Sequence, residues 1–591
     1  MKVLSIYWGI CASASIFIDG KVVAATHEER YTRIKNDDSF PENAINYCLS
    51  EAGISASELD LAVIASNIQE FNYQVTRHAK WSVEDYLKEQ INYWKPMLYD
   101  KKKLDYLEVF DYLKDYEQYP KDYWKANENN RSKFYMDRTK ILAQYLGINP
   151  NKCICIEHHR CHAAYAYYVS PFRGEEVLAF TIDGSGDGLN ATIGIYDKNG
   201  HYTRVYETDQ CFIGRIYRYI TLLLGMKPNE HEFKVMGLAP YGKAKYAKKA
   251  YEVFASTLYV DGIEFKWKQK PTDSYFWFKE RLEGIRFDNI AWGLQKWVED
   301  LLTEWIRNAI NKFKISKIII AGGVSMNIKA MGKISYLPEV QDIFIGGSAS
   351  DESMAISAGI CAVEDKDVEF NPIKMYPIQN LYLGQEASLY EEQVAIENLD
   401  SSYTIIDKFN AKDIATLLAN SAILARCAGR MEFGQRALGN RSILADPSNL
   451  RVRDTINDMI KNRDFWMPFA PIVMDKYMDI YLQNPKKIFS PYMTIGFDTT
   501  SIGYEAMIAA CHPADKSARP QMLTKDLNQN LYMILEEFEK IRGIGALLNT
   551  SFNLHGYPIV NTPSQAIYVL KNSGLDGLIL NNFIVLKNKE R

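Results

Sequence analysis

The sequence predicts an α/β protein with two domains, and three features of the chain support this fold class. Between residues 177 and 352, short apolar runs end repeatedly in glycine-rich turns, which is typical of buried strands. Residues 68–145 interrupt the strands with helical spacing and little glycine. A charged segment with two prolines, 363–380, then reads as an inter-domain linker. We therefore expect domains at 1–365 and 366–591, with a helical insertion in the first at about 68–145.

The composition is that of a globular protein with no general affinity for polyanions. The 591 residues carry a formal net charge of −4 at pH 7, so a local cluster of cations must hold any anionic ligand. The nine cysteines have no framework spacing, which is typical of reduced thiols in the cytoplasm. No run of roughly 18 apolar residues occurs, so we expect no membrane span. Nucleic acid is a less favoured partner than a small molecule.

The first 65 residues are predicted to form a strand, a turn, a strand, a helix and a strand. The apolar N-terminus is broken by glycine and serine and alternates like a hairpin, so it does not read as a signal peptide. An Asp-Gly pair at 19–20 suits the tight turn of that hairpin. We expect the helix from about Pro41 to Ala52, and the next strand in "LDLAVIAS". The aromatic residues of the following insertion either form its core or belong to a substrate-binding surface.

Two glycine turns at strand ends predict a nucleotide site. One turn lies in "DGSGDG", which starts at Asp183, and the other in "AGGVSMN", which starts at Ala321. Backbone N–H groups in such turns can bind phosphate. One turn alone is equally well a tight strand-to-helix connection. Two turns separated by a long helical segment favour the duplicated nucleotide clamp that actin, hexokinase and the heat-shock ATPases have.

The stretch "IEHHRCHAAYAYY" predicts a metal site. In a helix over 157–168, His158 and His162 lie one turn apart on the same face. Such a pair alone is more often a core or surface feature. Asp183 and Asp351, however, lie in glycine turns and can complete a mixed nitrogen and oxygen ligand set. Such a set suits iron, zinc or manganese and leaves open positions for catalysis.

The C-terminal part carries cations and amide or hydroxyl donors that suit a phosphate next to a planar amide. The alternative, solvated surface charge, fits poorly with the glycine, proline and aromatic residues between them. The candidates are Arg430, Arg436, Arg441, Lys461, Arg463, His512, Lys516, Arg519, Asn549, Ser551 and Asn553.

Seven motifs, in one order along nearly the whole chain, resemble the carbamoyltransferases of antibiotic and nodulation-factor biosynthesis. The resemblance implies an N-terminal domain of the ASKHA fold, which is the actin and hexokinase fold, and a YrdC-like α/β domain at the C-terminus. The motifs are "EERYTRIKNDDSFP", "EHHRCHAAYA", "DGSGD", "KVMGLAPYG", "GRMEFGQRALGNRSILADP", "MPFAP" and "LNTSFNLHGYPIV".

The resemblance also implies an ATP-dependent O-carbamoyltransferase. The C-terminal domain of such an enzyme uses carbamoyl phosphate and ATP, with Mg²⁺, to form carbamoyl adenylate and pyrophosphate. The N-terminal domain then passes the carbamoyl group to a hydroxyl of a small-molecule acceptor beside one divalent metal ion. A homodimer is the default expectation for the assembly. The sequence does not identify the acceptor.

Residue roles follow from the same resemblance. The metal ligands are His158, His162, Asp183 and Asp351. Carbamoyl phosphate is expected to contact Arg436, Lys461, Arg463, Arg519 and Ser551. The nucleotide is expected near Gly184, Gly186, Asp187, Gly188, Lys234, Gly322, Gly323, Asn327, Glu352 and Asn549. Catalysis and acceptor binding are expected at Lys35, Glu232 and Cys11.

The chain departs from the family pattern at the turn "GICASAS". Cys11 and Ala12 stand where the family usually has His and Asp, and that His is a plausible general base. Glu232, His231 or a metal-bound group can replace it. The acceptor can instead be an amine, which needs less activation, or transfer can have been lost.

A second departure is Met467, which stands where several family members have an arginine, and Arg463 or Arg519 can compensate. Two other readings of the whole chain remain: a small-molecule kinase or ATPase of the ASKHA type, and a non-catalytic binding protein. The cationic C-terminal part argues against the first. The intact histidine pair and arginine set argue against the second.

Overall fold

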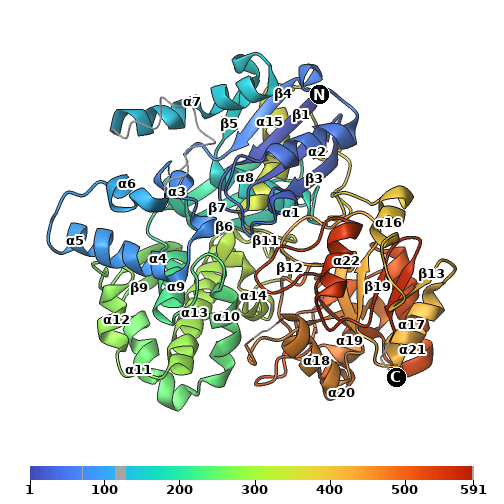
Figure 1. Cartoon of the computed structure of the whole chain (residues 1–591). Coiled ribbons are helices and arrows are strands. Elements are labelled where there is room, and N and C mark those ends of the chain that lie inside the picture. The colour runs from blue at the N-terminus through green and yellow to red at the C-terminus, as the bar shows by residue number, and fades with distance from the viewer. Residues whose placement is uncertain (69–70, 114–127, 462–463, 589–591) are drawn as a thin grey trace. The chain divides into compact units, whose positions relative to one another are not determined.

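The computed structural model describes residues 1–68, 71–113, 128–461 and 464–588. The chain divides into two compact units, Met1–Ile378 and Gln379–Arg591, which we call the first and second units. Each unit consists of helices and β-strands in mixed sheets, so the predicted α/β class is confirmed (Figure 1).

The first unit contains two five-stranded sheets with the same strand order. In each sheet the first three strands are antiparallel neighbours, and the last two run parallel to the first strand. The order is β3-β2-β1-β4-β5 in one sheet and β8-β7-β6-β11-β12 in the other. The sheets therefore show the predicted duplication. Their strands are β1 (Lys2–Tyr7), β2 (Ser13–Ile18), β3 (Lys21–His27), β4 (Leu61–Ala65), β5 (Cys153–Ile156), β6 (Val177–Gly186), β7 (Leu189–Tyr196), β8 (Tyr202–Thr208), β11 (Lys317–Ala321) and β12 (Asp342–Phe344).

The predicted hairpin, helix and following strand are present at the N-terminus, but three strands, β1 to β3, precede the helix where two were predicted, and a short helix, α1 (Glu29–Thr32), follows β3. Asp19 and Gly20, with φ of 46° and 84°, form the turn between β2 and β3, and both are in the left-handed region that a tight hairpin requires. Helix α2 (Glu42–Ala52) follows the hairpin.

The prediction for "DGSGDG" is wrong in one respect. Strand β6 continues through Gly186, and the turn is made by Asp187 and Gly188, with φ of 49° and 86°. The segment therefore forms a hairpin with β7 and does not lead into a helix.

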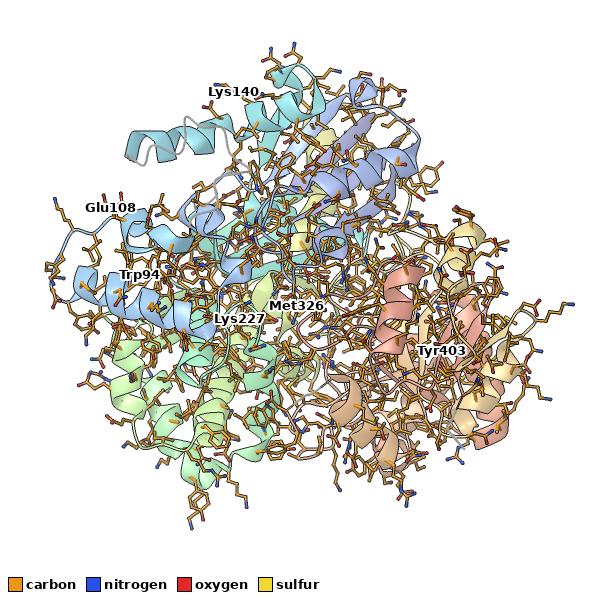
Figure 2. All side chains as sticks on the ribbon, in the orientation of Figure 1. Trp94, Glu108, Lys140, Lys227, Met326 and Tyr403 are labelled. Carbon is orange, nitrogen blue, oxygen red and sulfur yellow. The ribbon has the colours of Figure 1, made fainter. Side chains whose placement is uncertain are left out.

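The described part of the insertion consists of helices joined by short loops, and residues 69–70 and 114–127 lie outside the described part. Its aromatic side chains Trp81, Tyr86, Tyr106 and Phe110 are buried in one core with residues of β1. These four side chains thus support the core reading of the insertion. Trp94 and Glu108 lie on its helical segments (Figure 2). The helices are α3 (Phe71–Thr76), α4 (Val83–Lys88), α5 (Lys95–Leu98), α6 (Tyr106–Val109) and α7 (Glu128–Leu146).

The longer remaining helices of the first unit pack against its sheets or against one another. Helix α15 contacts α8 and strands of the first sheet, and the long α13 contacts α11 and α14. These helices are α8 (His158–Tyr168), α9 (Ile213–Leu223), α10 (Glu232–Leu238), α11 (Ala244–Ala255), α12 (Phe276–Leu282), α13 (Phe287–Phe313), α14 (Ile328–Ser335) and α15 (Met354–Lys366).

The second unit is built on one eight-stranded sheet. Neighbouring residues of β15, Ile443 and Leu444, belong to two different apolar clusters, so each face of the sheet has its own core. Helices α16 (Leu389–Ile396) and α22 (Pro563–Lys571) pack together, as do α17 (Ala411–Ala419) and α21 (Gln529–Arg542). The sheet order is β13-β20-β19-β14-β15-β18-β16-β17. The strands are β13 (Tyr403–Ile406), β14 (Leu424–Cys427), β15 (Arg441–Ala445), β16 (Ala470–Met474), β17 (Gln521–Leu523), β18 (Ala546–Ser551), β19 (Gly577–Ile579) and β20 (Ile584–Lys587).

Two expectations about the whole chain can be compared with the structure. All nine cysteines are free thiols, as their spacing predicts. Among the described helices, none has the length and apolar character needed to cross a bilayer.

Candidate functional site

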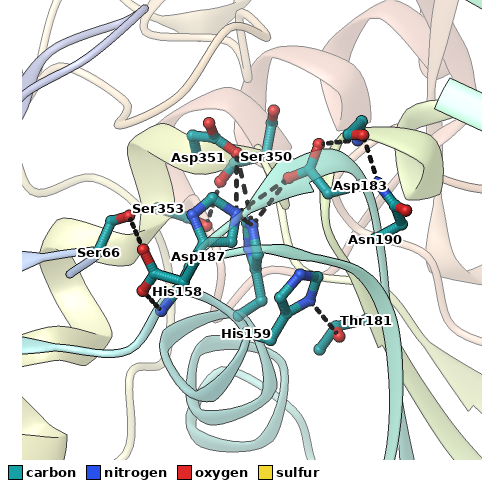
Figure 3. A network of polar contacts seen from close by, with 12 residues as sticks. Ser66, His158, His159, Thr181, Asp183, Asp187, Asn190, Ser350, Asp351 and Ser353 are labelled. Atoms are coloured by element: carbon teal, nitrogen blue, oxygen red, sulfur yellow. Dashed lines mark hydrogen bonds and ion pairs between the residues drawn. The ribbon is translucent and has the colours of Figure 1, made fainter. Parts of the chain in front are cut away.

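Two histidines of α8 converge on one point. The helix begins at His158, and the carboxylate of Glu157 caps it by accepting from the backbone N–H groups of His159 and Arg160. His158 and His162 are one turn apart, and their Nε2 atoms lie 3.1 Å from each other (Figure 3). The helix predicted from local spacing is therefore present, and it directs both imidazoles to the same place.

Two carboxylates complete the group. Asp183 Oδ2 lies 3.3 Å from His158 Nε2 and 3.1 Å from His162 Nε2. Asp351 Oδ1 lies 3.8 Å and 3.4 Å from the same two nitrogens. One ligand atom from each of the four residues lies within 4.8 Å of all the others, so together they can hold a metal ion. The imidazoles are buried and the carboxylates are partly exposed, so the centre is open on the carboxylate side.

The electrostatics of this group favour a cation. Burial opposes ionisation of Asp183, but hydrogen bonds with both histidines outweigh it and hold the pKa of Asp183 well below its usual range. Burial opposes protonation of His162, but the hydrogen bond to Asp183 and the negative charges of Asp183 and Asp351 raise its pKa to about 9. Burial and the neighbouring Asp183 raise the pKa of Asp351. The four side chains thus attract positive charge.

The donor set also fits a metal ion stereochemically. Asp351 Oδ1 is buried and has no hydrogen-bond partner among the described residues, although it faces the two Nε2 atoms. An unpaired buried carboxylate oxygen is costly unless a cation or a donor meets it. Two imidazoles and two carboxylates are ligands that iron, zinc and manganese accept.

Several residues predicted to bind nucleotide have structural partners here. The carboxylate of Asp187 accepts from the backbone N–H groups of His158, Asn67 and Ile68, at 2.7–2.8 Å, and from the hydroxyl of Ser66 at 2.8 Å. It therefore ties the end of β4 to the start of α8 (Figure 3).

Two further residues of that predicted set are also engaged. Asn327 caps α14 and exchanges two hydrogen bonds with Gln295. Glu352 is buried and accepts from the hydroxyl of Ser348, and burial raises its pKa to about 7. Lys234 lies in the first turn of α10.

The two predicted glycine turns lie at one edge of the second sheet. Strands β6 and β11 run parallel, with Ala321 beside Thr181, so Gly322, which follows β11, lies next to the part of β6 that carries Asp183. An added Cβ at Gly323 would lie 3.3 Å from Asp183 Oδ1, and one at Gly322 would lie 2.3 Å from the carbonyl oxygen of Ile182. The close approach requires glycine at 322, where φ is 95°.

Gly186 leaves the space that the His158 ring occupies. A Cβ at residue 186 would lie 2.1 Å from Cδ2 of His158, whereas a Cβ at Gly184 would meet nothing within 4 Å. We expect Gly186→Ala to displace the imidazole and to lower metal content and affinity, measured by titration with Zn²⁺ or Mn²⁺. Gly184→Ala, on the same strand, is the matched control and keeps metal binding. Equal affinity in both variants would contradict this account.

The predicted acceptor residues form a second polar group in the first unit. Lys35 Nζ pairs with Glu230 Oε1 at 2.6 Å, and Lys227 Nζ pairs with the other oxygen of Glu230 at 3.0 Å. The two lysines lower the pKa of Glu230 to about 2 in spite of its burial. The partner of Lys35 is thus Glu230, an acid that the sequence analysis did not single out. Lys227 is labelled in Figure 2.

Cys11 and Glu232 are joined to this group through two asparagines. The Cys11 thiol donates to Asn36 Oδ1 at 3.4 Å, and Asn36 donates to the carbonyl of Asn229 at 3.5 Å. The N–H of Asn229 in turn donates to Glu232 Oε1 at 2.7 Å. The three residues predicted for catalysis and acceptor binding therefore lie in one connected region.

In the second unit, four adjacent strands share an edge. Strand β15 runs antiparallel to β18, with Ser442 opposite Ser551, so β15 starts where β18 ends. Strand β16 is also antiparallel to β18, with Ala470 opposite Asn549. Strand β17 is parallel to β16 and starts at the same edge.

Most of the residues predicted to bind carbamoyl phosphate lie at this edge. Asn549, which was predicted to bind the nucleotide, lies there too. Arg436 precedes β15, Arg519 precedes β17, and Asn549 and Ser551 lie at the end of β18. Asn549 donates to the carbonyl of Ala437 at 3.0 Å, whereas its Oδ1 is buried without a hydrogen-bond partner in the described chain. Such an oxygen is suited to a ligand donor.

The segment that leads into β16 belongs to the same edge. Lys461 ends the π-helical turn η10 (Asn457–Lys461), and its side chain lies outside the described part of the chain. Arg463 lies outside the described residues altogether. Met467, where the family often has arginine, is buried.

Two arginines counted among the anion-binding candidates have other partners. Arg441 is fully buried, and its guanidinium donates to four backbone carbonyls. Arg430 donates to the carbonyls of Leu383 and Gly384. Because these acceptors are backbone carbonyls, the two arginines hold in place the loop that carries Arg436.

Sequence reasoning missed one residue that shapes this loop. Glu432 is buried, and its Oε1 accepts from the backbone N–H groups of Leu438, Asn440 and Arg441 at 2.6–3.2 Å. The signal was present as a lone acid between apolar residues in "GRMEFGQRALGN". Glu432 thereby holds the loop in which Arg436 lies.

Comparison with known proteins gives matches along both units. The family model described as "Carbamoyltransferase N-terminus" matches residues 4–360, and the model "Carbamoyltransferase C-terminus" matches residues 415–587. These matches confirm the resemblance inferred from the motifs.

Similar proteins occur in distant organisms. The uncharacterized protein sll1178 of Synechocystis sp. is 30% identical over 98% of this chain and 95% of its own length. The uncharacterized protein MJ1058 of Methanocaldococcus jannaschii is 31% identical over 73% of each chain. The nodulation protein NolNO of Sinorhizobium fredii is 28% identical over 97% of this chain and 78% of its own length.

Proposed function

Because this chain belongs to the carbamoyltransferase family, as the two family models show, we propose that it is an ATP-dependent O-carbamoyltransferase with two reaction centres. One observation carries the proposal: the chain has both a His-His-Asp-Asp group in the first unit and a sheet edge with arginine, serine and amide groups in the second. A small-molecule kinase has no need of the second.

The second unit, taken as a YrdC-like domain over 366–591, forms the activated donor. Water cleaves carbamoyl phosphate to carbamate and phosphate. The carbamate oxygen then attacks the α-phosphate of ATP, with Mg²⁺, which forms carbamoyl adenylate and releases pyrophosphate. Arg436 and Lys461 bind the phosphate dianion and offset its repulsion from ATP. Arg519 and Ser551 supply further donors at the same edge, and Asn549 Oδ1 accepts from the nucleotide or the carbamoyl amide.

The first unit, taken as an ASKHA-type domain over 1–365, transfers the carbamoyl group. His158, His162, Asp183 and Asp351 hold a divalent ion, which supplies Lewis-acid chemistry when bound. The acceptor oxygen attacks the carbamoyl carbon, the bond to the adenylate phosphate breaks, and AMP leaves. The glycine turns at both strand ends contact the nucleotide through backbone N–H groups.

Glu232 is the candidate base that replaces the missing histidine. Burial raises its pKa to about 7, where a carboxylate exchanges protons at neutral pH. His231 is less suited, because burial and Lys234 lower its pKa to about 4. The Cys11 thiol donates to Asn36, so it is positioned as a donor and not as a base.

The base assignment predicts a pH dependence. If Glu232 must be ionised, single-turnover transfer rises as pH increases through about 7 and is constant above that, because the carboxyl group is protonated below its pKa. Glu232→Gln is expected to be slow at every pH. Glu230→Gln removes a charge that raises the pKa of Glu232, so the midpoint is expected to move to lower pH. A profile that Glu232→Gln leaves intact would exclude this role.

Pyrophosphate release tests the first half of the proposal. Purified protein given ATP, Mg²⁺ and carbamoyl phosphate, with no acceptor, is expected to release pyrophosphate only when carbamoyl phosphate is present. If none appears, a pooled library of hydroxyl and amine acceptors tests whether turnover requires an acceptor. No release in either experiment would contradict the proposed activity.

A further inference from the structure

A buried hydroxyl that is not one of the four metal-binding residues donates a hydrogen bond to one of them. Tyr7 is the last residue of β1, and its phenol donates to Asp351 Oδ2 at 2.7 Å. The Tyr7 side chain is buried, at 5% exposure. The other oxygen, Oδ1, faces His158 and His162 and has no hydrogen-bond partner among the described residues. The two carboxylate oxygens of Asp351 therefore have different surroundings.

The antiparallel pair β1 and β2 also holds the backbone around Asp351. Ser13 of β2 donates to the carbonyl of Glu352 at 2.8 Å, and Ser5 of β1 donates to the carbonyl of Ala355 at 2.5 Å. These two bonds fix the main chain of the segment but do not touch the carboxylate. Among the described residues, Tyr7 is the one that hydrogen-bonds the Asp351 carboxylate from the side away from the histidines.

We propose that Tyr7 is a positioning residue for the metal centre: its hydroxyl holds Asp351 Oδ2, so that Oδ1 is presented to the ion beside His158 and His162. This inference rests on the metal site of the proposed function. A carboxylate ligand that is hydrogen-bonded from behind loses less rotational freedom on binding, and such partners typically change metal affinity 10–100-fold. The first sheet thereby supports a ligand set whose members come from α8, β6 and the segment that starts at Asp351.

The test measures metal affinity without turnover. Tyr7→Phe removes only the hydroxyl, and we expect its dissociation constant for Mn²⁺ or Zn²⁺, from chelator competition, to rise about 10-fold or more. Tyr7→4-aminophenylalanine restores a donor on the ring and is expected to recover most of the affinity. In an Asp351→Ala background, Tyr7→Phe is expected to bring no further loss, because the effect passes through that carboxylate.

Ser13→Ala is the matched control, since it removes the hydrogen bond from β2 to the backbone of Glu352, the residue next to Asp351. It is expected to keep metal affinity within about twofold, well inside the effect of a direct ligand partner. Unchanged affinity in Tyr7→Phe, or an equal loss in Ser13→Ala, would overturn the inference. If Tyr7→Phe does not fold, Tyr7→4-fluorophenylalanine fills the space without a donor. If the unaltered chain binds no metal, the proposed metal site fails, which is a distinguishable result.

Discussion

Replacing His162 with alanine is expected to lower carbamoyl transfer more than about 100-fold, because loss of a group behind a metal ligand already costs roughly 10–100-fold. The imidazole is fully buried and faces Asp183 and His158, so the variant loses one of the four proposed ligands of the metal ion. Pyrophosphate release from ATP and carbamoyl phosphate is expected to stay near the unaltered rate, since we assign that step to the second unit. Both activities are measured on the same preparation, with metal content.

His159 provides the matched control for this prediction. It is buried in the same helix, but its Nδ1 pairs with Thr181 Oγ1 at 2.7 Å instead of facing the carboxylates. His159→Gln is expected to retain metal and transfer. Loss of both activities in His162→Ala, together with a lowered melting temperature, would show that the imidazole is structural.

The metal-binding group illustrates what a sequence can predict. The i,i+4 spacing of two histidines in a helix is local, so His158 and His162 could be placed on one face without knowledge of the fold. Asp183 and Asp351 can be recognised because each lies in a glycine-rich segment, and the family resemblance places both among the metal ligands. Tyr7 had no such signal, because it is one apolar-looking position in an N-terminal strand, and its contact depends on how the first sheet meets the 351 segment.

The second unit shows the opposite difficulty. Arg430, Arg436 and Arg441 look alike in "GRMEFGQRALGN", and composition alone assigns all three to an anion. The structure shows backbone carbonyls as the acceptors of two of them, and such capping depends on the path of a distant segment at 383–385. Similarly, strand β6 continues through Gly186 because it pairs with β7 in a hairpin, and this pairing outweighs the turn preference of glycine.

Arg436→Ala is expected to nearly abolish carbamoyl-phosphate-dependent pyrophosphate release at carbamoyl phosphate concentrations near the KM of the unaltered chain. Removing one partner of a desolvated, hydrogen-bonded charge pair costs about 2–5 kcal/mol. That corresponds to at least a roughly 30-fold rise in the KM for carbamoyl phosphate. The loop that carries this arginine is held independently by Glu432, whose carboxylate accepts from three backbone N–H groups, so the fold is expected to survive the change. Steady-state pyrophosphate release, with each substrate varied in turn, gives both KM values.

The neighbouring Arg430 provides the control for this prediction. Arg430 donates to carbonyls of 383 and 384, so Arg430→Ala is expected to lower the melting temperature and to affect both substrates alike. Arg436→Ala is expected instead to raise the KM for carbamoyl phosphate much more than that for ATP, because the arginine meets a dianion that only the first substrate brings. If the two variants showed the same kinetic pattern, Arg436 would be a loop residue like its neighbours, and the phosphate would have to be bound elsewhere on this sheet edge.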